Sequence, residues 1–347
     1  MSTLKKGIHD RLNRVSHWDV NVTNLERSRA WYEATTTLRV FARTYASQDF
    51  PSLRLRQSSF KGLMMRDSTL PPGAPMIHLV EWTAPQPVGK PNLSHAHVGW
   101  FRIVPTVESI EATRQAVLAQ GSEPFTSTTD SAIRLSPTLP DLHYQVFTVH
   151  DPDGVAVEFS DKRTQAGLVP TAPYTVAHNT ANFEKNLDFY LNVLGLDFHT
   201  SVQTQSSIPN VYSPGGGSTG FSGAFFTVRG NQGYVFDWLQ WNESPEHPKP
   251  YEEANHVGIV RCSIEVDDVD ASYTILKHLS RSQRPFFSVA EPEVWDFGPE
   301  FGVRKVVNFQ DPEGVGFQLV EQPRFPVVLH PWGHGAEQKQ DPALENA

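Results

Sequence analysis

The sequence contains a single cysteine, Cys262, among its 347 residues. One thiol excludes an internal disulfide and any zinc site built from several cysteines, and it suits a reducing cytoplasm, where we expect the protein. Cys262 lies in an apolar segment and is predicted to be a buried thiol. A metal ion must therefore be held by histidine and carboxylate side chains, and the 14 histidines keep that chemistry open.

Long apolar runs and clusters of positive charge are also missing. No segment has the 18 or so consecutive apolar residues of a membrane span, and residues 1–15 lack the apolar stretch of a signal peptide. Lys and Arg number 29 against 38 Asp and Glu, and the basic residues are scattered. We therefore expect no nucleic acid and no membrane as partners.

The chain repeats itself at about half its length. The sequence Asp-Pro-Asp-Gly-Val at residues 151–155 returns as Asp-Pro-Glu-Gly-Val at residues 311–315, and His-Val-Gly at residues 97–99 returns at residues 256–258. A nearly constant offset over such a distance indicates a duplicated domain. We predict an N-terminal domain over residues 12–163, a linker over 164–173, a C-terminal domain over 174–323 and a flexible tail over 324–347.

Each half divides again into two similar units. Residues 18–22 alternate as in a strand and are followed by Asn24, a typical N-cap, and Asn182 plays the same part in the second half. The Asp-Pro-x-Gly sequences separate pairs of β-branched and aromatic runs, as in hairpins. The pattern predicts an α+β fold of four βαβββ modules, two in each half.

These repeated openings and closings resemble the vicinal oxygen chelate (VOC) superfamily. The opening is His-Trp-Asp-Val-Asn-Val-Thr-Asn-Leu-Glu-Arg-Ser at residues 17–28, the closing is Asp-Pro-Asp-Gly-Val-Ala-Val-Glu at residues 151–158, and the resemblance covers residues 12–322. The superfamily includes glyoxalase I, bleomycin-resistance proteins and extradiol dioxygenases. The resemblance implies that two βαβββ units close into a cup, with metal ligands on the first and last strand of each unit.

The resemblance also implies which positions face the metal. The opening-strand ligand lies seven residues before the residue that starts the helix, and the closing-strand ligand follows from the repeated motifs. In the first half these positions hold His17, His78 and Glu158, with Arg102 in the fourth place. The second half offers Thr175, Asp237, Arg261 and Gln318. Only the first half is therefore expected to bind a divalent ion, and the second is expected to be a degenerate site.

Two imidazoles and one carboxylate match non-haem Fe(II) oxygenases and also Mn, Ni or Zn lyases and isomerases. Such an ion chelates two vicinal oxygens of a substrate and stabilises developing negative charge. We predict an enzyme with His17, Glu158 and Arg102 as catalytic residues, and with Arg102, His97 and Tyr144 binding substrate. The second opening strand has Arg where extradiol dioxygenases have His, which argues against ring cleavage. The resemblance also implies a small-molecule substrate, and a homodimer is compatible with this family.

A metal-free interpretation stands beside this one. Arg102 is able to form a buried ion pair with Glu158 in place of the cation, and Arg261 with Asp237 in the second half. The protein would then be a metal-independent binding or resistance protein, or a cofactor-free cyclase or isomerase in which Glu158 or His17 is the general base and Arg102 holds an enolate. In each case the cup is a ligand pocket.

Overall fold

The computed structural model describes residues 7–70, 73–92, 94, 96–125, 128–133, 142–161, 171–209, 218–229, 234–241, 248–282 and 287–322. The predicted tail and most of the predicted linker lie outside these residues, so those boundaries stay predictions. Cys262 is buried, as predicted. No helix in the described part of the chain is long and apolar enough to cross a membrane.

The chain folds into four modules of one helical segment and several strands, which confirms the predicted fold class. The first contains β1 (Leu12–Asn21), α1 (Leu25–Thr35), β2 (Leu38–Phe50), β3 (Leu55–Asp67) and β4 (Met76–Ala84). The second contains β5 (Gly99–Pro105), α2 (Ile110–Ala119), β6 (Thr129–Ile133), β7 (Leu142–His150) and β8 (Ala156–Ser160).

The second half repeats this order. The third module contains β9 (Thr171–Asn179), α3 (Phe183–Asp188) with a π-helical continuation (Phe189–Leu194), β10 (Asp197–Pro209), β11 (Ser218–Thr227) and β12 (Tyr234–Trp241). The fourth contains β13 (Gly258–Val266), α4 (Val269–Ser282), β14 (Ser288–Val289), β15 (Glu293–Asp296), β16 (Val303–Gln310) and β17 (Gly316–Glu321). Helix starts follow the predicted caps, because the side chains of Asn24 and Asn182 accept hydrogen bonds from backbone N–H groups of the first turn.

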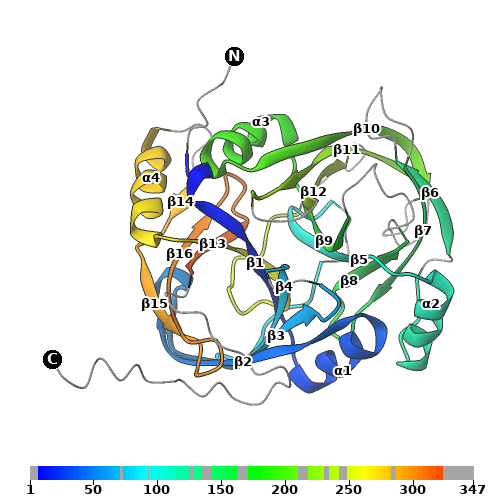
Figure 1. The fold of residues 1–347 in the computed structure, drawn as a ribbon, viewed down its shortest axis with the longest axis horizontal. Helices are drawn as coiled ribbons and strands as arrows, with labels where there is room; N and C mark the ends of the chain where they lie inside the picture. Colours follow the sequence, from blue (N-terminus) through cyan, green and yellow to red (C-terminus); the bar gives the residue numbers. More distant parts are fainter. Residues whose placement is uncertain are drawn as a thin grey trace.

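The modules pair differently from the prediction. One sheet has the order β14-β16-β17-β13-β1-β4-β3-β2, and the other has the order β10-β11-β12-β9-β5-β8-β7-β6. The first module therefore shares a sheet with the fourth, and the second with the third (Figure 1). The expectation that residues 12–163 and 174–323 each close a cup of their own is corrected here. A repeat shows which modules are alike but not which strand edges meet. Antiparallel pairing of β1 with β13 joins the first module to the fourth, and that of β5 with β9 joins the second to the third.

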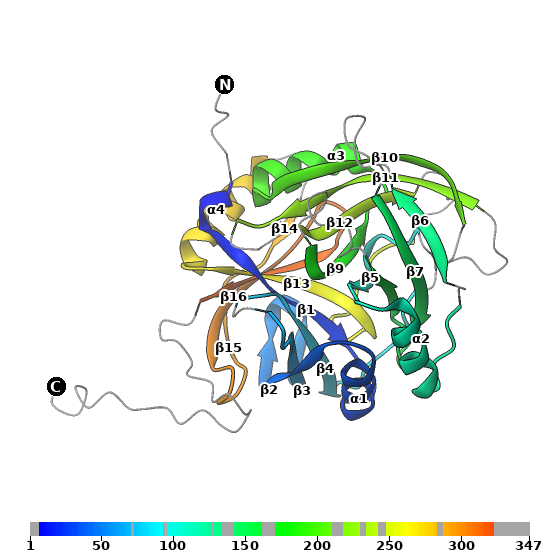
Figure 2. The ribbon, with the colours of Figure 1, turned by 45° about the vertical axis from the view of Figure 1, so that its right-hand side comes forward.

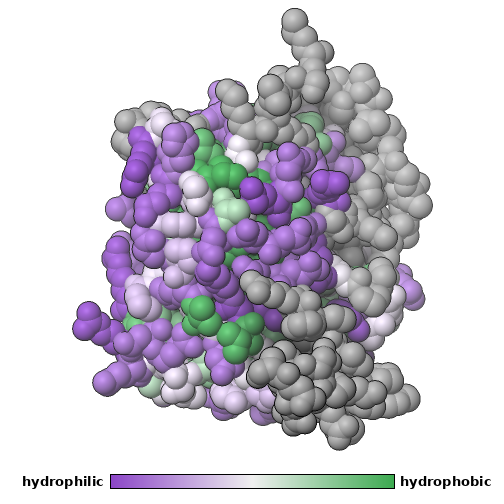
Figure 3. All heavy atoms as spheres, turned by 60° about the vertical axis from the view of Figure 1, so that its left-hand side comes forward, coloured by the Kyte–Doolittle hydropathy of each residue, from purple (hydrophilic) through white to green (hydrophobic). Residues whose placement is uncertain are grey.

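The two sheets pack against each other through apolar side chains. The ring of Trp18 on β1 lies 6.5 Å from that of Trp100 on β5 and 6.0 Å from that of Phe236 on β12. The helices lie at the periphery of the molecule (Figures 1 and 2). Because side chains alternate along a strand, the neighbours of Trp18, which are His17 and Asp19, face the opposite, concave side of their sheet. The face of the molecule shown in Figure 3 is mainly hydrophilic.

Candidate functional site

Strands β1 and β4 bring three chelating side chains together on the concave face of the first sheet. The strands are parallel neighbours, with Asp19 opposite His78. Asp19 Oδ1 lies 2.7 Å from His78 Nδ1 and 3.5 Å from His17 Nε2. Potential ligand atoms of the three residues all lie within 4.8 Å of one another. The sequence-predicted residues His17 and His78 are thus neighbours, and Asp19 joins them.

Each of the three side chains is held by a second partner on its other polar atom. The hydroxyl of Ser16 lies 3.0 Å from His17 Nδ1, and that of Thr44 lies 2.7 Å from His78 Nε2. Such outer partners orient imidazole and carboxylate ligands in metal sites. Gly62 on β3 leaves room for the Thr44–His78 pair, because a Cβ there would lie 2.5 Å from Thr44 Oγ1 and 2.6 Å from His78 Nε2.

The other oxygen of Asp19 is bound by Arg261 on β13. Oδ2 accepts a hydrogen bond from Nε at 2.7 Å and forms an ion pair with Nη2 at 2.6 Å. Arg261 also donates to Asn308 and lies over the Trp295 ring, 5.1 Å from its centroid. This ion pair joins the first module to the fourth across the centre of the sheet.

Burial and neighbouring charges set the protonation of His17 and Asp19. His17 is fully buried, and burial, opposed by Asp19 and helped by His78 and Arg261, lowers its pKa to about 3. Burial acts to raise the pKa of Asp19, but Arg261, His78 and His17 outweigh it and hold that pKa well below its usual range. Around neutral pH His17 is therefore a neutral imidazole and Asp19 a carboxylate, which are the forms that bind metals.

Two features of the cluster suit a divalent ion. They are its nitrogen and carboxylate donors and one buried donor atom that has no hydrogen bond within the described part of the chain. His17 Nε2 is buried without a hydrogen-bond partner. Its 3.5 Å separation from Asp19 Oδ1 is close to the spacing of about 3.3 Å between two ligands of a tetrahedral ion with bonds of about 2.0–2.1 Å. The contact between His78 Nδ1 and Asp19 is a hydrogen bond, whose proton the ion would replace. The remaining nitrogen of His78 faces the Thr44 hydroxyl, which is able to donate to it or to accept from it, so this nitrogen has a partner with either tautomer.

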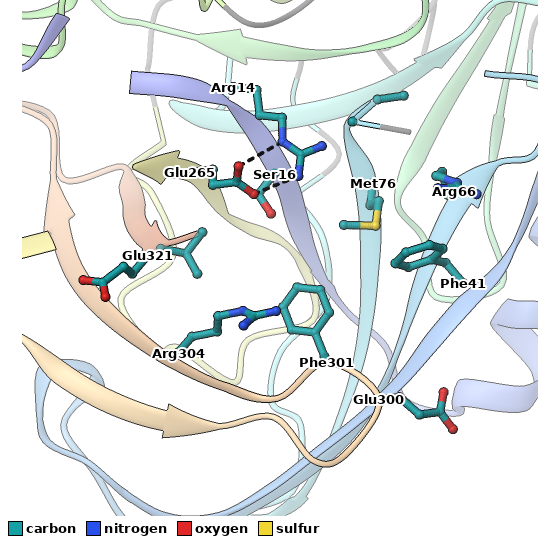
Figure 4. A pocket seen from close by; sticks show the side chains of 13 residues that line it. Arg14, Ser16, Phe41, Arg66, Met76, Glu265, Glu300, Phe301, Arg304 and Glu321 are labelled. Carbon is teal, nitrogen blue, oxygen red and sulfur yellow. Dashed lines mark hydrogen bonds and ion pairs between the residues drawn. The ribbon is translucent and has the colours of Figure 1, made fainter. Parts of the chain in front are cut away.

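Two cavities flank the cluster. One, of about 190 Å³, is lined by Ser16, Met76 and Phe301 (Figure 4). Each of these residues is a neighbour of His17. The other, of about 530 Å³, is lined by Arg261 and Asn308. The Phe301 ring stands edge-on to His17 with centroids 6.2 Å apart. Phe301 thus lines the first cavity and also contacts His17.

The predicted residues Glu158 and Arg102 do not join His17 and His78. They lie on β8 and β5 of the second sheet, because the first and second modules belong to different sheets. Arg102 Nε lies 3.4 Å from Glu158 Oε2, and its Nη2 lies 3.4 Å from Asp237 Oδ2. The expected ligand set of His17, His78 and Glu158 is corrected accordingly. The ion pair expected between Arg261 and Asp237 is replaced by Arg261–Asp19 and Arg102–Asp237.

Two further predicted residues lie elsewhere. The His97 ring packs on Tyr251 with centroids 4.6 Å apart, and burial, with His256 and His178, lowers its pKa to about 4. Tyr144 is buried on β7, in the sheet of Arg102. Their roles in substrate binding stay predictions.

Sequence reasoning missed Asp19, although a signal was present. Asp19 is two residues after His17 in an alternating strand, so both side chains share a face. The hydroxyls of Ser16 and Thr44 gave no comparable signal. Thr44 becomes a neighbour of His78 only through the pairing of β2, β3 and β4.

Comparison with known proteins agrees with this architecture. The family model of the Glyoxalase/Bleomycin resistance protein/Dioxygenase superfamily matches residues 174–319. The chain therefore carries a domain of this superfamily. The match spans the third and fourth modules, which the structure places in different sheets. A comparison with curated protein sequences gives no match.

Two solved structures are similar in fold to most of the chain. Glyoxalase I from Zea mays superposes with a TM-score of 0.56 at 14% identity, covering 89% of this chain and 92% of that one. A "putative dioxygenase" from Bacillus subtilis superposes with a TM-score of 0.52 at 12% identity, covering 90% of this chain and 86% of that one. At these identities the likeness concerns the fold alone, so the chemistry has to be argued from this chain's own residues.

Proposed function

We propose that the protein is a metal-dependent enzyme of the glyoxalase and dioxygenase superfamily that acts on a small oxygenated molecule, with His17, Asp19 and His78 holding a divalent Fe, Mn, Ni or Zn ion. The observation that carries this proposal is the unpartnered, buried His17 Nε2 beside the Asp19 carboxylate. The three ligands lie on adjacent strands, and each is oriented by a neighbour, namely Ser16, Arg261 or Thr44.

The residues of the chain have distinct parts in this chemistry. A bound ion would act as a Lewis acid on substrate oxygens. Ser16 and Thr44 fix the orientation of the two imidazoles, and Arg261 keeps Asp19 ionised. Phe301 and Phe297 exclude water from the cluster, because both rings pack within the apolar group that fills this cup.

Metal analysis tests the proposal. Protein purified without chelator and equilibrated with Zn²⁺ is expected to retain about one ion, and His17→Ala, Asp19→Asn and His78→Ala are each expected to weaken its binding by at least about 100-fold, since loss of an outer partner alone costs about 10–100-fold. Glu158→Gln is the matched control and should bind the ion like the wild type, because Glu158 lies in the other sheet. A wild type that retains none of the four metals would refute the proposal.

A second candidate function is metal-independent and uses the other sheet. It is favoured by Arg102, which is buried between Glu158 and Asp237. In a cyclase or isomerase Glu158 would act as the general base while Arg102 holds an enolate. In a binding protein the same pair would grip a ligand without turnover. Turnover that survives exhaustive chelation but falls by about 100-fold or more in Glu158→Gln would support the enzyme, since general-base catalysis contributes about 10²–10⁴-fold.

A further inference from the structure

The cavity beside His17 contains a buried positive charge that the protein does not neutralise. Arg304 on β16 lines this cavity and is only 8% exposed. Within the described residues its guanidinium has neither a hydrogen bond nor an ion pair, and it lies over the Phe301 ring, 5.0 Å from the centroid. Burial lowers the pKa of Arg304, and Glu265 acts in the opposite direction without pairing to it. A guanidinium stays protonated in proteins, so this site favours an anion.

A second guanidinium that forms no ion pair within the described residues lines the same cavity. Arg66 on β3 also lines it, and its guanidinium carbon lies 4.5 Å from the centroid of the Phe41 ring. No carboxylate of the described chain forms an ion pair with Arg66. Figure 4 shows Arg66 beside Phe41 and Arg304 beside Phe301, with Met76 between the two rings. An anion in the cavity would therefore meet arginines from two modules.

The acidic residues around the cavity are engaged elsewhere. Both carboxylate oxygens of Glu265 accept hydrogen bonds from Arg14, at 3.1 and 2.8 Å. Glu300 accepts a hydrogen bond from the backbone N–H of Arg43, and Glu321 accepts one from that of Val269. In Figure 4 the carboxylates of Glu300 and Glu321 point away from the Arg304 guanidinium. The charge of Arg304 is thus left for a ligand.

The remaining walls of the cavity are apolar, and they include Phe41, Met76, Phe301 and Val320. We infer that this cavity binds a small organic carboxylate, whose charged group is held by Arg304 and whose apolar or aromatic body packs on Phe41, Met76 and Phe301. Guanidinium recognises carboxylate by two parallel hydrogen bonds. A cavity of about 190 Å³ limits the ligand to a small molecule.

The position of the cavity connects this ligand with the proposed metal centre. Ser16 lines the cavity and bonds to His17, Met76 is the strand neighbour of His17, and Phe301 lies edge-on to the His17 ring. If the carboxylate bound in this cavity is also the substrate of the metal centre, the inference rests on the proposed function. As a statement about binding, it rests on the arginines alone.

Benzoate and benzamide are suitable probes, because they have nearly the same shape and differ in charge. In protein treated with EDTA, we expect benzoate to bind at least tenfold more tightly than benzamide, measured by titration calorimetry or by ligand NMR. Arg304→Met should remove this preference and leave benzamide binding unchanged, whereas Arg304→Lys should keep part of it. Arg43→Met is the matched control, because Arg43 is exposed and contacts the outward-pointing Glu300.

Equal binding of the two probes by the wild type would overturn the inference, and so would a benzoate preference that persists in Arg304→Met. If Arg304→Met does not fold, Arg66→Met provides the test, with a reduced preference expected and an unchanged one counting against the inference. Metal content separates the two claims. A benzoate preference in a protein that retains no metal would leave this anion site standing while the proposed function fails, and a metal-binding protein without the preference would do the reverse.

Discussion

Arg261→Met is expected to lower the free energy of unfolding by about 3–5 kcal/mol, because it leaves the Asp19 carboxylate buried without its counter-charge. Asp19 is 2% exposed, and two guanidinium nitrogens lie within 2.7 Å of its Oδ2. The double variant Asp19→Asn with Arg261→Met should recover much of the loss, since no buried charge remains. Urea unfolding of the four proteins would give the coupling energy directly.

An exposed pair supplies the control for this cycle. Arg29 bonds to Glu26 and Glu33 on the surface of α1, so Arg29→Met is expected to cost no more than about 1 kcal/mol.

The effect of Zn²⁺ on the stability of Arg261→Met provides a second test. A cation bound at Asp19 Oδ1 replaces the missing positive charge, so zinc at about 100 times its dissociation constant should restore about 2.7 kcal/mol to Arg261→Met. Stability of this variant that does not change with zinc would contradict the metal site.

The four modules could be predicted from the sequence, but their pairing could not. The caps at Asn24 and Asn182 and the Asp-Pro-x-Gly turns are local signals, and local signals were enough to predict four βαβββ modules. The pairing of the modules is not local. It depends on which strand edges meet, such as β1 with β13, residues that are about 240 positions apart in the chain. Nothing in the spacing of the repeat distinguishes this arrangement from pairing of consecutive modules.

For the candidate site too, only contacts within one module could be predicted from the sequence. His17 and His78 belong to one module, so their proximity followed from the register of two strands within that module. Glu158 and Arg261 belong to other modules, and their positions relative to His17 depended on the pairing that the sequence did not reveal. Arg304 was not predicted at all, because the absence of a partner around a buried side chain is a property of the packed structure.

The buried carboxyl of Asp151 is expected to make the free energy of unfolding depend strongly on pH. Its carboxyl is buried, accepts hydrogen bonds from the backbone N–H groups of Asp153 and Val155, and accepts one from the Tyr32 hydroxyl at 3.0 Å. Burial, followed by the nearby charge of Asp153, raises its pKa from 3.8 to about 7. The folded protein therefore holds a proton between about pH 4 and pH 7 that the unfolded chain has released.

Because the folded state binds more protons in this window, stability falls as the pH rises through it and levels off above about pH 7. Asp151→Asn removes the titration while its side-chain oxygen still accepts the backbone hydrogen bonds. Relative to wild type, the variant should therefore gain about 3 kcal/mol in unfolding free energy between about pH 5 and pH 8, since one pKa unit corresponds to about 1.4 kcal/mol. Tyr32→Phe should remove one hydrogen bond and leave most of this pH dependence in place, because burial is its main cause. Urea unfolding at both pH values measures the difference, and a gap between variant and wild type that is the same at both would show that Asp151 is ionised throughout.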